Sequence, residues 1–203
     1  MKVKISSYKK SVYEANINKE MQALIWDFYV TRSFANSASQ KRAVKDFGIQ
    51  VIPFKEMITN ADISEDNCKI LPCTTMKNTI TKLGFDTEQK IKGVKQEVEI
   101  DIDTPRMCCL QAFTVNEQLE VETNSSSQAD CLFTHIRNAF AHGNTYFFDN
   151  GNVLLEDKER GKITAKILIA VETLIKWIKL IDVNHTVYPE LEDGGIYATL
   201  KVN

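Results

Sequence analysis

The apolar segment at residues 163–181 is the feature that most limits how this chain can fold, because so many aliphatic side chains in succession must be buried. Charged residues interrupt it at four positions: Lys166, Glu172, Lys176 and Lys179. A membrane-spanning helix would not carry so many charges, so we predict a long helix that begins near Ile163 and packs one face against a protein core. The first ten residues also lack the apolar run of a signal peptide. The sequence therefore predicts a cytoplasmic protein with no membrane partner.

Length and composition favour one folded unit. The chain has 203 residues, of which 43% are hydrophobic and 26% are charged, values that are typical of a globular domain and not of a disordered chain. Its formal net charge of -2 and its pI of about 6.0 give little support to a general nucleic-acid binder, which usually has a basic excess. Two basic groups, within residues 41–45 and 77–95, leave a local patch open.

The cysteines and histidines do not follow a metal-binding pattern. No two cysteines have the two-residue separation of a zinc site, and the three histidines are too few for a site built from imidazoles. We therefore predict free thiols, no metal site and no cofactor. The cysteines are Cys68, Cys73, Cys108, Cys109 and Cys131.

A helix that ends at Gly143 carries the residues with the most distinctive chemistry. The polar cluster at residues 124–128 is expected to cap its amino-terminal end. Glycine just beyond a helix commonly adopts the left-handed conformation that ends it, so His142 lies in the final turn, near the negative end of the helix dipole. Arg137 lies away from much of the apolar face. That face is formed by Ala129, Leu132, Phe133, Ile136, Ala139 and Phe140.

Arg137 and His142 are suited to phosphate chemistry, because arginine offers a charged planar fork of donors and histidine exchanges a proton near neutral pH. They are five residues apart and do not share one helix face. Asn138, however, is four residues before His142 and can orient the imidazole or touch a ligand. A simpler interpretation stays open, in which Arg137 forms a surface salt bridge and His142 only caps carbonyl groups. His135 and His185 are interpreted as structural, with His135 the better second candidate because it lies close to the motif.

The segment after this helix predicts a β-hairpin. Asn150-Gly151 lies between two β-prone runs and matches a tight primed turn, which requires positive φ at both central residues. A charged corner at residues 157–161 then precedes the long helix expected from Ile163.

Together these features resemble the HEPN superfamily, whose signature is an Arg, four to six further residues and a His. The matching residues are Arg137-Asn138-Ala139-Phe140-Ala141-His142, with the Asn that frequently follows the Arg in that family. The aromatic hairpin at residues 144–157 and the apolar helix after it are similar to the plasmid-encoded subgroup named after the pEK499 p136 protein. The similarity covers residues 128–182.

The resemblance implies a mainly α fold, a HEPN-type helical bundle with a short β-hairpin between the motif helix and the last long helix. We expect a single domain over residues 1–203. It would consist of N-terminal helices that we do not recognise (1–125), the motif helix, hairpin and last long helix (126–182), and a C-terminal tail (183–203).

Periodicity predicts several helices upstream of the motif. Asn18 or Asn16 is expected to cap a helix that runs to Val30. Further helices are predicted over residues 37–47, 54–59, 74–83, 88–98 and 105–118, an extended segment over 49–52, a loop over 62–72 and a short strand over 196–202.

The resemblance also implies a metal-independent endoribonuclease, in which the ribose 2′-hydroxyl attacks the adjacent phosphate and leaves 2′,3′-cyclic phosphate and 5′-hydroxyl ends. His142 would be the general acid or base, Arg137 would hold the phosphate oxygens, and Asn138 would position either group. Because the family usually pairs two motif helices across a dimer, we expect a homodimer with the site at its cleft. The implied partners are RNA, with tRNA as one candidate, and an antitoxin or other protein, in defence, plasmid maintenance or stress response.

Two other functions stay open. A catalytically silent HEPN interaction module could bind a protein or nucleic acid through the same groove, but the intact Arg137, Asn138 and His142 favour the nuclease. A partnership with a nucleotidyltransferase antitoxin, which modifies a tyrosine two positions after the motif histidine, is less favoured because Asn144 occupies that position.

Overall fold

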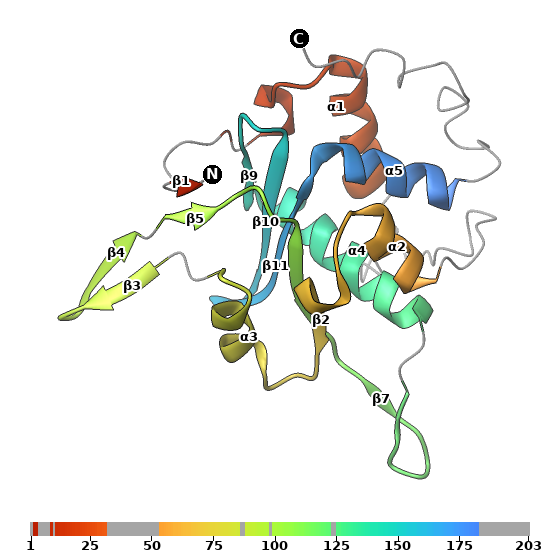
Figure 1. Ribbon diagram of the computed structural model, residues 1–203. Coiled ribbons are helices and arrows are strands. Elements are labelled where there is room, and N and C mark those ends of the chain that lie inside the picture. Colours follow the sequence, from red (N-terminus) through yellow and green to blue (C-terminus); the bar gives the residue numbers. More distant parts are fainter. Residues whose placement is uncertain are drawn as a thin grey trace.

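The computed structural model describes residues 2–3, 9, 11–31, 53–85, 88–97, 99–122 and 125–182. Its centre is a five-stranded sheet with the order β2-β6-β11-β10-β9 (Figure 1). Neighbouring strands run antiparallel, except that β2 runs parallel to β6. The strands span Cys68–Leu71 (β2), Arg106–Leu110 (β6), Thr145–Phe147 (β9), Asn152–Glu159 (β10) and Lys162–Ala170 (β11).

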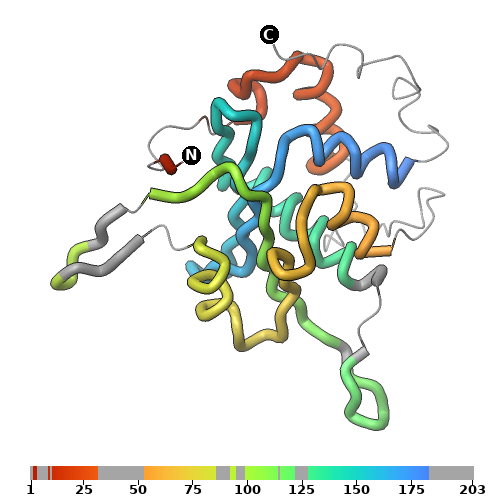
Figure 2. The backbone as a smooth tube through the Cα atoms, viewed as in Figure 1, coloured from red at the N-terminus to blue at the C-terminus, as the bar shows by residue number. Residues whose placement is uncertain are grey.

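Helices cover the two faces of this sheet unequally. One face carries α1 (Lys19–Trp26), α2 (Phe54–Asn60), α4 (Ser125–Ala141) and α5 (Val171–Ile181), and the π-helical segment η2 (Asp27–Thr31) continues α1. The other face carries α3 (Met76–Lys82). Figure 2 shows the same division, with α3 on the opposite side of the sheet from α4 and α5. None of the helices in the described ranges is long and apolar enough to cross a membrane.

Short elements complete the described chain. Three two-stranded pairs lie outside the main sheet: β1 (Lys2–Val3) with β5 (Ile100–Asp101), β3 (Glu88–Ile91) with β4 (Val94–Glu97), and β7 (Thr114–Val115) with β8 (Val121–Glu122). Two 3-10 turns, η1 (Val12–Glu14) and η4 (Glu65–Asn67), connect longer elements. The β7–β8 hairpin projects from the body and exposes Leu119 at its turn (Figure 1).

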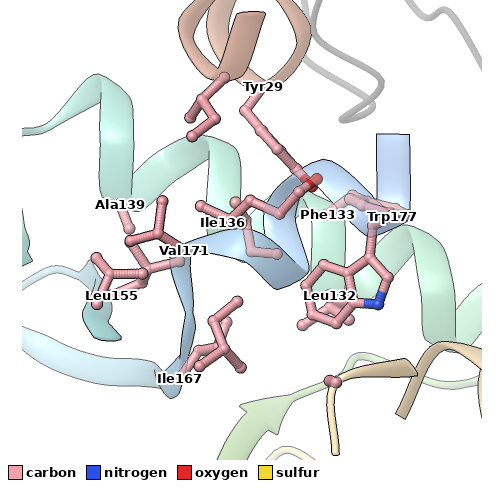
Figure 3. Packing of buried hydrophobic residues seen from close by; sticks show 14 of the residues in the cluster. Tyr29, Leu132, Phe133, Ile136, Ala139, Leu155, Ile167, Val171 and Trp177 are labelled. Carbon is pink, nitrogen blue, oxygen red and sulfur yellow. The ribbon is translucent and has the colours of Figure 1, made fainter. Parts of the chain in front are cut away.

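The larger core lies between the sheet and the four helices of its crowded face (Figure 3). Each fully buried large apolar side chain stabilises the fold by roughly 1.5–3 kcal/mol. The polar atoms of two aromatic side chains in this core are hydrogen-bonded. Trp177 Nε1 donates to the Met57 carbonyl at 3.0 Å, and Tyr29 Oη donates to the Leu174 carbonyl at 2.8 Å. The apolar face predicted for the motif helix is confirmed, since all six of its residues are buried here.

The prediction of a mainly α fold is wrong, because the core is built on a mixed sheet. The clearest error concerns residues 163–181, which form strand β11 and then helix α5 instead of one long helix. Both faces of β11 are covered by protein, so its apolar residues do not alternate with polar ones in the way that reveals a half-exposed strand. Ala170 is extended, with φ -66 and ψ 142, and the helix begins directly after it.

Several upstream predictions are also wrong. Residues 88–97 form a hairpin instead of a helix, and its turn residues Lys92 and Gly93 both have positive φ, as a primed turn requires. Residues 106–110 form the buried strand β6 within the helix predicted over 105–118, and the expected loop at 62–72 contains β2. The segments predicted over 37–47, 49–52 and 196–202 lie outside the described residues.

Other local predictions are confirmed. Asn18 caps α1 by accepting a 2.7 Å hydrogen bond from Met21 N, and α2 and α3 lie where helices were expected. The hairpin between β9 and β10 also forms, but its turn differs from the prediction, because only Gly151 has positive φ. The Phe148 amide instead donates to the Asn152 carbonyl across a three-residue loop.

Candidate functional site

The carboxyl-terminal end of α4 is closed by its own backbone. Gly143 has φ +65, its amide donates to the Phe140 carbonyl at 3.1 Å, and the Asn144 amide reaches back to the Ala139 carbonyl at 2.9 Å. These two bonds form a Schellman motif, in which a left-handed glycine satisfies the last carbonyls of a helix. The predicted helix end is therefore confirmed, and the His142 side chain is not needed as a cap for these two carbonyls.

His142 occupies the last position before this glycine and is exposed. Its backbone amide donates to the Asn138 carbonyl at 2.9 Å, which keeps it on the final turn of the helix. No hydrogen bond or ion pair involves its imidazole among the residues that the structure describes. A histidine held on a rigid helix end with an uncommitted ring can exchange protons with a bound molecule.

Arg137 is half-buried and is held through Asn138. Arg137 Nη1 donates to Asn138 Oδ1 at 3.1 Å, and Asn138 Nδ2 donates to Asp157 Oδ2 at 3.1 Å. Within the described ranges Arg137 makes no salt bridge, and its buried Nε has no hydrogen-bond partner there. The simpler interpretation of Arg137 as half of a surface ion pair is therefore not supported by the described contacts.

The carboxylate behind Asn138 belongs to a buried pair that the sequence interpretation missed. Asp157 lies on β10 and accepts a 2.8 Å hydrogen bond at Oδ2 from His135 Nδ1, while His135 Nε2 faces the Leu110 carbonyl at 2.8 Å. Both ring nitrogens face acceptors, so both carry a proton and His135 is an imidazolium. His135 was expected to be structural, and its spacing of three residues from Asn138 was the available signal that the two share a helix face.

The pKa values agree with this assignment. Burial alone lowers the pKa of His135, but the hydrogen bonds to Asp157, Cys131 and the Leu110 carbonyl outweigh it and raise the pKa from 6.5 to about 10. Burial alone raises the pKa of Asp157, but the hydrogen bonds from His135 and Asn138 outweigh it and lower the pKa. The pair is therefore charged at neutral pH, with one positive and one negative group.

A second buried charge cluster lies on the opposite face of the sheet. Glu156 precedes Asp157 on β10, and its side chain accepts from Lys166 Nζ at 3.1 Å and from Lys158 Nζ at 2.9 Å. Lys166 Nζ also donates to the Phe85 carbonyl at 3.0 Å. Burial alone raises the pKa of Glu156, but the two lysines outweigh it and lower the pKa. Successive strand residues point to opposite faces, so this cluster is separate from the Asp157 pair.

The described residues offer no metal centre, since no three His, Cys, Asp or Glu side chains there are grouped to hold an ion. Among the described residues, the site thus consists of the His142 imidazole, which has no partner there, the Arg137 guanidinium, whose buried Nε has none there either, and the Asn138 amide, which is fixed between that guanidinium and a carboxylate.

The motif helix, with the hairpin and helix after it, is the part of the chain in which the HEPN resemblance was seen. Residues 47–186, well over half of the chain, match the family model described as HEPN pEK499 p136, and the chain belongs to that family. Comparison with curated proteins and with solved structures finds no match. The resemblance seen in residues 128–182 therefore extends upstream into the strands that were not recognised from sequence.

Proposed function

We propose that the protein is a metal-independent endoribonuclease whose site is Arg137, Asn138 and His142. The observation that supports this most is the exposed His142 ring, which has no partner in the described part of the chain and lies at the end of the helix that carries an anchored Arg137. A phosphate clamp and a proton-transfer group on one rigid element are the two parts that RNA cleavage without a metal needs. Membership of the HEPN family agrees with this chemistry.

In the proposed reaction the ribose 2′-hydroxyl attacks the adjacent phosphate. His142 removes the proton from this hydroxyl or donates one to the leaving 5′-oxygen. Arg137 stabilises the charge that accumulates on the non-bridging oxygens, and Asn138 keeps the guanidinium in place. The products are a 2′,3′-cyclic phosphate and a 5′-hydroxyl.

One imidazole does not easily perform both proton transfers. His135 cannot supply the second, because both of its nitrogens are engaged by Asp157 and the Leu110 carbonyl. We therefore propose a symmetric homodimer that brings two His142 side chains to one cleft. The proposed setting is defence, toxin–antitoxin function or stress response, with RNA such as tRNA as substrate and a neutralising protein as partner.

The test is cleavage of total RNA and purified tRNA by the protein in EDTA. His142→Ala and Arg137→Ala should each lower the rate by about 100-fold or more, whereas the exposed Lys162→Ala should not change it. Circular dichroism establishes that each variant is folded, and light scattering measures its oligomeric state.

Two results decide the question. EDTA-resistant cleavage with cyclic-phosphate ends, lost in both folded variants and kept in Lys162→Ala, would support the nuclease. Equal cleavage by all four proteins, or none by a folded wild type on either RNA, would refute it and favour the silent interaction module.

A further inference from the structure

We propose that Asp157 and His135 act as a positioning pair that sets the orientation of the Asn138 amide and, through it, of the Arg137 guanidinium. Asp157 and His135 lie outside the Arg-x4-His motif, and neither is proposed to touch the RNA. The catalytic consequence of this arrangement rests on the proposed ribonuclease function, whereas the orientation itself does not.

The donors and acceptors around Asn138 allow only one orientation of its amide. A carboxylate can only accept and a guanidinium can only donate, whereas an amide does both. Asn138 therefore turns its Nδ2 towards Asp157 and leaves Oδ1 to accept from Arg137 Nη1. The flipped amide would place its oxygen against the carboxylate and its NH2 against the guanidinium, and both contacts would be repulsive. Asp157 thus determines which way the amide points.

The charges around Asn138 leave Arg137 positive. A direct Arg137–Asp157 ion pair would fix the guanidinium but would also neutralise it and compete with a phosphate. Here the negative charge of Asp157 is matched by the His135 imidazolium at 2.8 Å, and the neutral Asn138 amide stands between the carboxylate and Arg137. The arrangement orients Arg137 and leaves its positive charge available for an anion.

Rigid elements hold the His135–Asp157 pair in place. His135 and Asn138 are one turn apart on α4, which packs against β10, and both His135 and Asp157 are buried. The pairing of β10 with β11 shifts between Asp157 and Lys158, and irregularities of this kind commonly re-aim a side chain near a functional site. The carbonyl of Leu110, at the end of β6, holds the other side of the His135 ring.

A double-mutant cycle tests the positioning role through activity. Asp157→Asn should lower kcat by about 10- to 100-fold with KM changed less than about threefold, because the guanidinium is displaced from the transition state. In the Arg137→Ala background the same substitution should change kcat by less than about twofold, since Asp157 acts through Arg137. Glu159→Gln, an exposed neighbour on β10, is the control and should leave kcat unchanged. Equal losses in both backgrounds would overturn the proposal.

A second variant covers the possibility that Asp157→Asn does not fold. Asn138→Ala keeps the His135–Asp157 hydrogen bond but removes the amide that joins Asp157 to Arg137, so it should lower kcat by a similar factor while the His135 ring stays doubly protonated at pH 8. Nitrogen-15 spectra measure the protonation of the His135 ring and the chemical shift of the Arg137 Nε–H group. Unchanged kcat in Asn138→Ala, or a neutral His135 ring in the wild type, would overturn the proposal.

Nuclear magnetic resonance also separates the two proposals. If the wild type cleaves no RNA, the ribonuclease proposal fails, but the Arg137 Nε–H signal should still shift in Asn138→Ala and stay in place in Glu159→Gln. An Arg137 signal that is the same in all three proteins would overturn the positioning role, whatever the activity.

Discussion

The His135–Asp157 pair should make the stability of the protein fall as the pH rises from neutrality. His135 has its pKa raised from 6.5 to about 10 by the folded state, so its contribution is complete below 6.5 and is lost as the pH rises through about 10. Asp157 has its pKa lowered, so its contribution is present above the ordinary value of 3.8 and is lost only in acid. In mildly alkaline solution the folded state therefore holds one proton more than the unfolded state.

The magnitude follows from proton linkage. When the folded state holds one proton more than the unfolded state, the free energy of unfolding falls by about 1.4 kcal/mol for each unit by which the pH rises. The full contribution of His135 to that free energy is at most about 5 kcal/mol. The useful window runs from about pH 7 to about pH 8.5 and corresponds to a loss of about 2 kcal/mol. Higher pH is avoided because burial raises the pKa of Cys68 and Cys108 from 9.0 to about 12, and unfolded thiols would then ionise as well.

Urea denaturation at several pH values across this window measures the slope. The wild type and the control Glu159→Gln should both lose about 2 kcal/mol. Asp157→Asn removes the carboxylate that keeps His135 charged, so burial leaves the folded ring neutral and the loss should shrink to below about 0.5 kcal/mol. A flat wild-type profile, or the same slope in Asp157→Asn, would show that His135 is not an imidazolium in the folded protein.

Two further substitutions test the helix end and the second charge cluster by urea denaturation. Gly143→Ala should destabilise the protein by about 1 kcal/mol, because φ is +65 and no heavy atom lies within 4 Å of the added Cβ, so only backbone strain acts; an unchanged or higher stability would contradict the Schellman end. Lys166→Met should cost about 3 kcal/mol by removing a buried partner of Glu156, and adding Glu156→Gln should restore part of it; a neutral single variant would mean that the pair is not buried in solution.

The motif helix could be predicted from sequence because its signals are local. The spacing of its apolar residues identified the buried face of α4, and Gly143 identified its end, where the backbone bonds close the last turn. The same local reasoning located Asn18 as the cap of α1. Each of these features depends on side chains within about one turn of one another.

The sheet could not be predicted in the same way, because its strands are recognised by what covers them. β6 reads Arg-Met-Cys-Cys-Leu and its first four residues are buried, so neither alternation nor length distinguishes it from a helical segment. β11 and α5 form one uninterrupted apolar run in sequence, and no glycine or proline marks Ala170 as the point where strand becomes helix. Only the pairing with β6 and β10 determines that residues 162–170 are extended.

The same limit explains why Asn138 was identified as a candidate but its partner was not. Asp157 was predicted to lie in a charged corner, where a carboxylate would be solvated, and a solvated carboxylate has no reason to orient an amide. On β10, Asp157 faces α4 and is buried there, so its charge needs hydrogen-bond and ion-pair partners. Burial therefore converts an ordinary charged residue into an anchor, and the anchor accounts for the residue type at position 138. Only a side chain that donates to a carboxylate and accepts from a guanidinium satisfies both neighbours, and asparagine does so without adding a charge that would compete for Arg137.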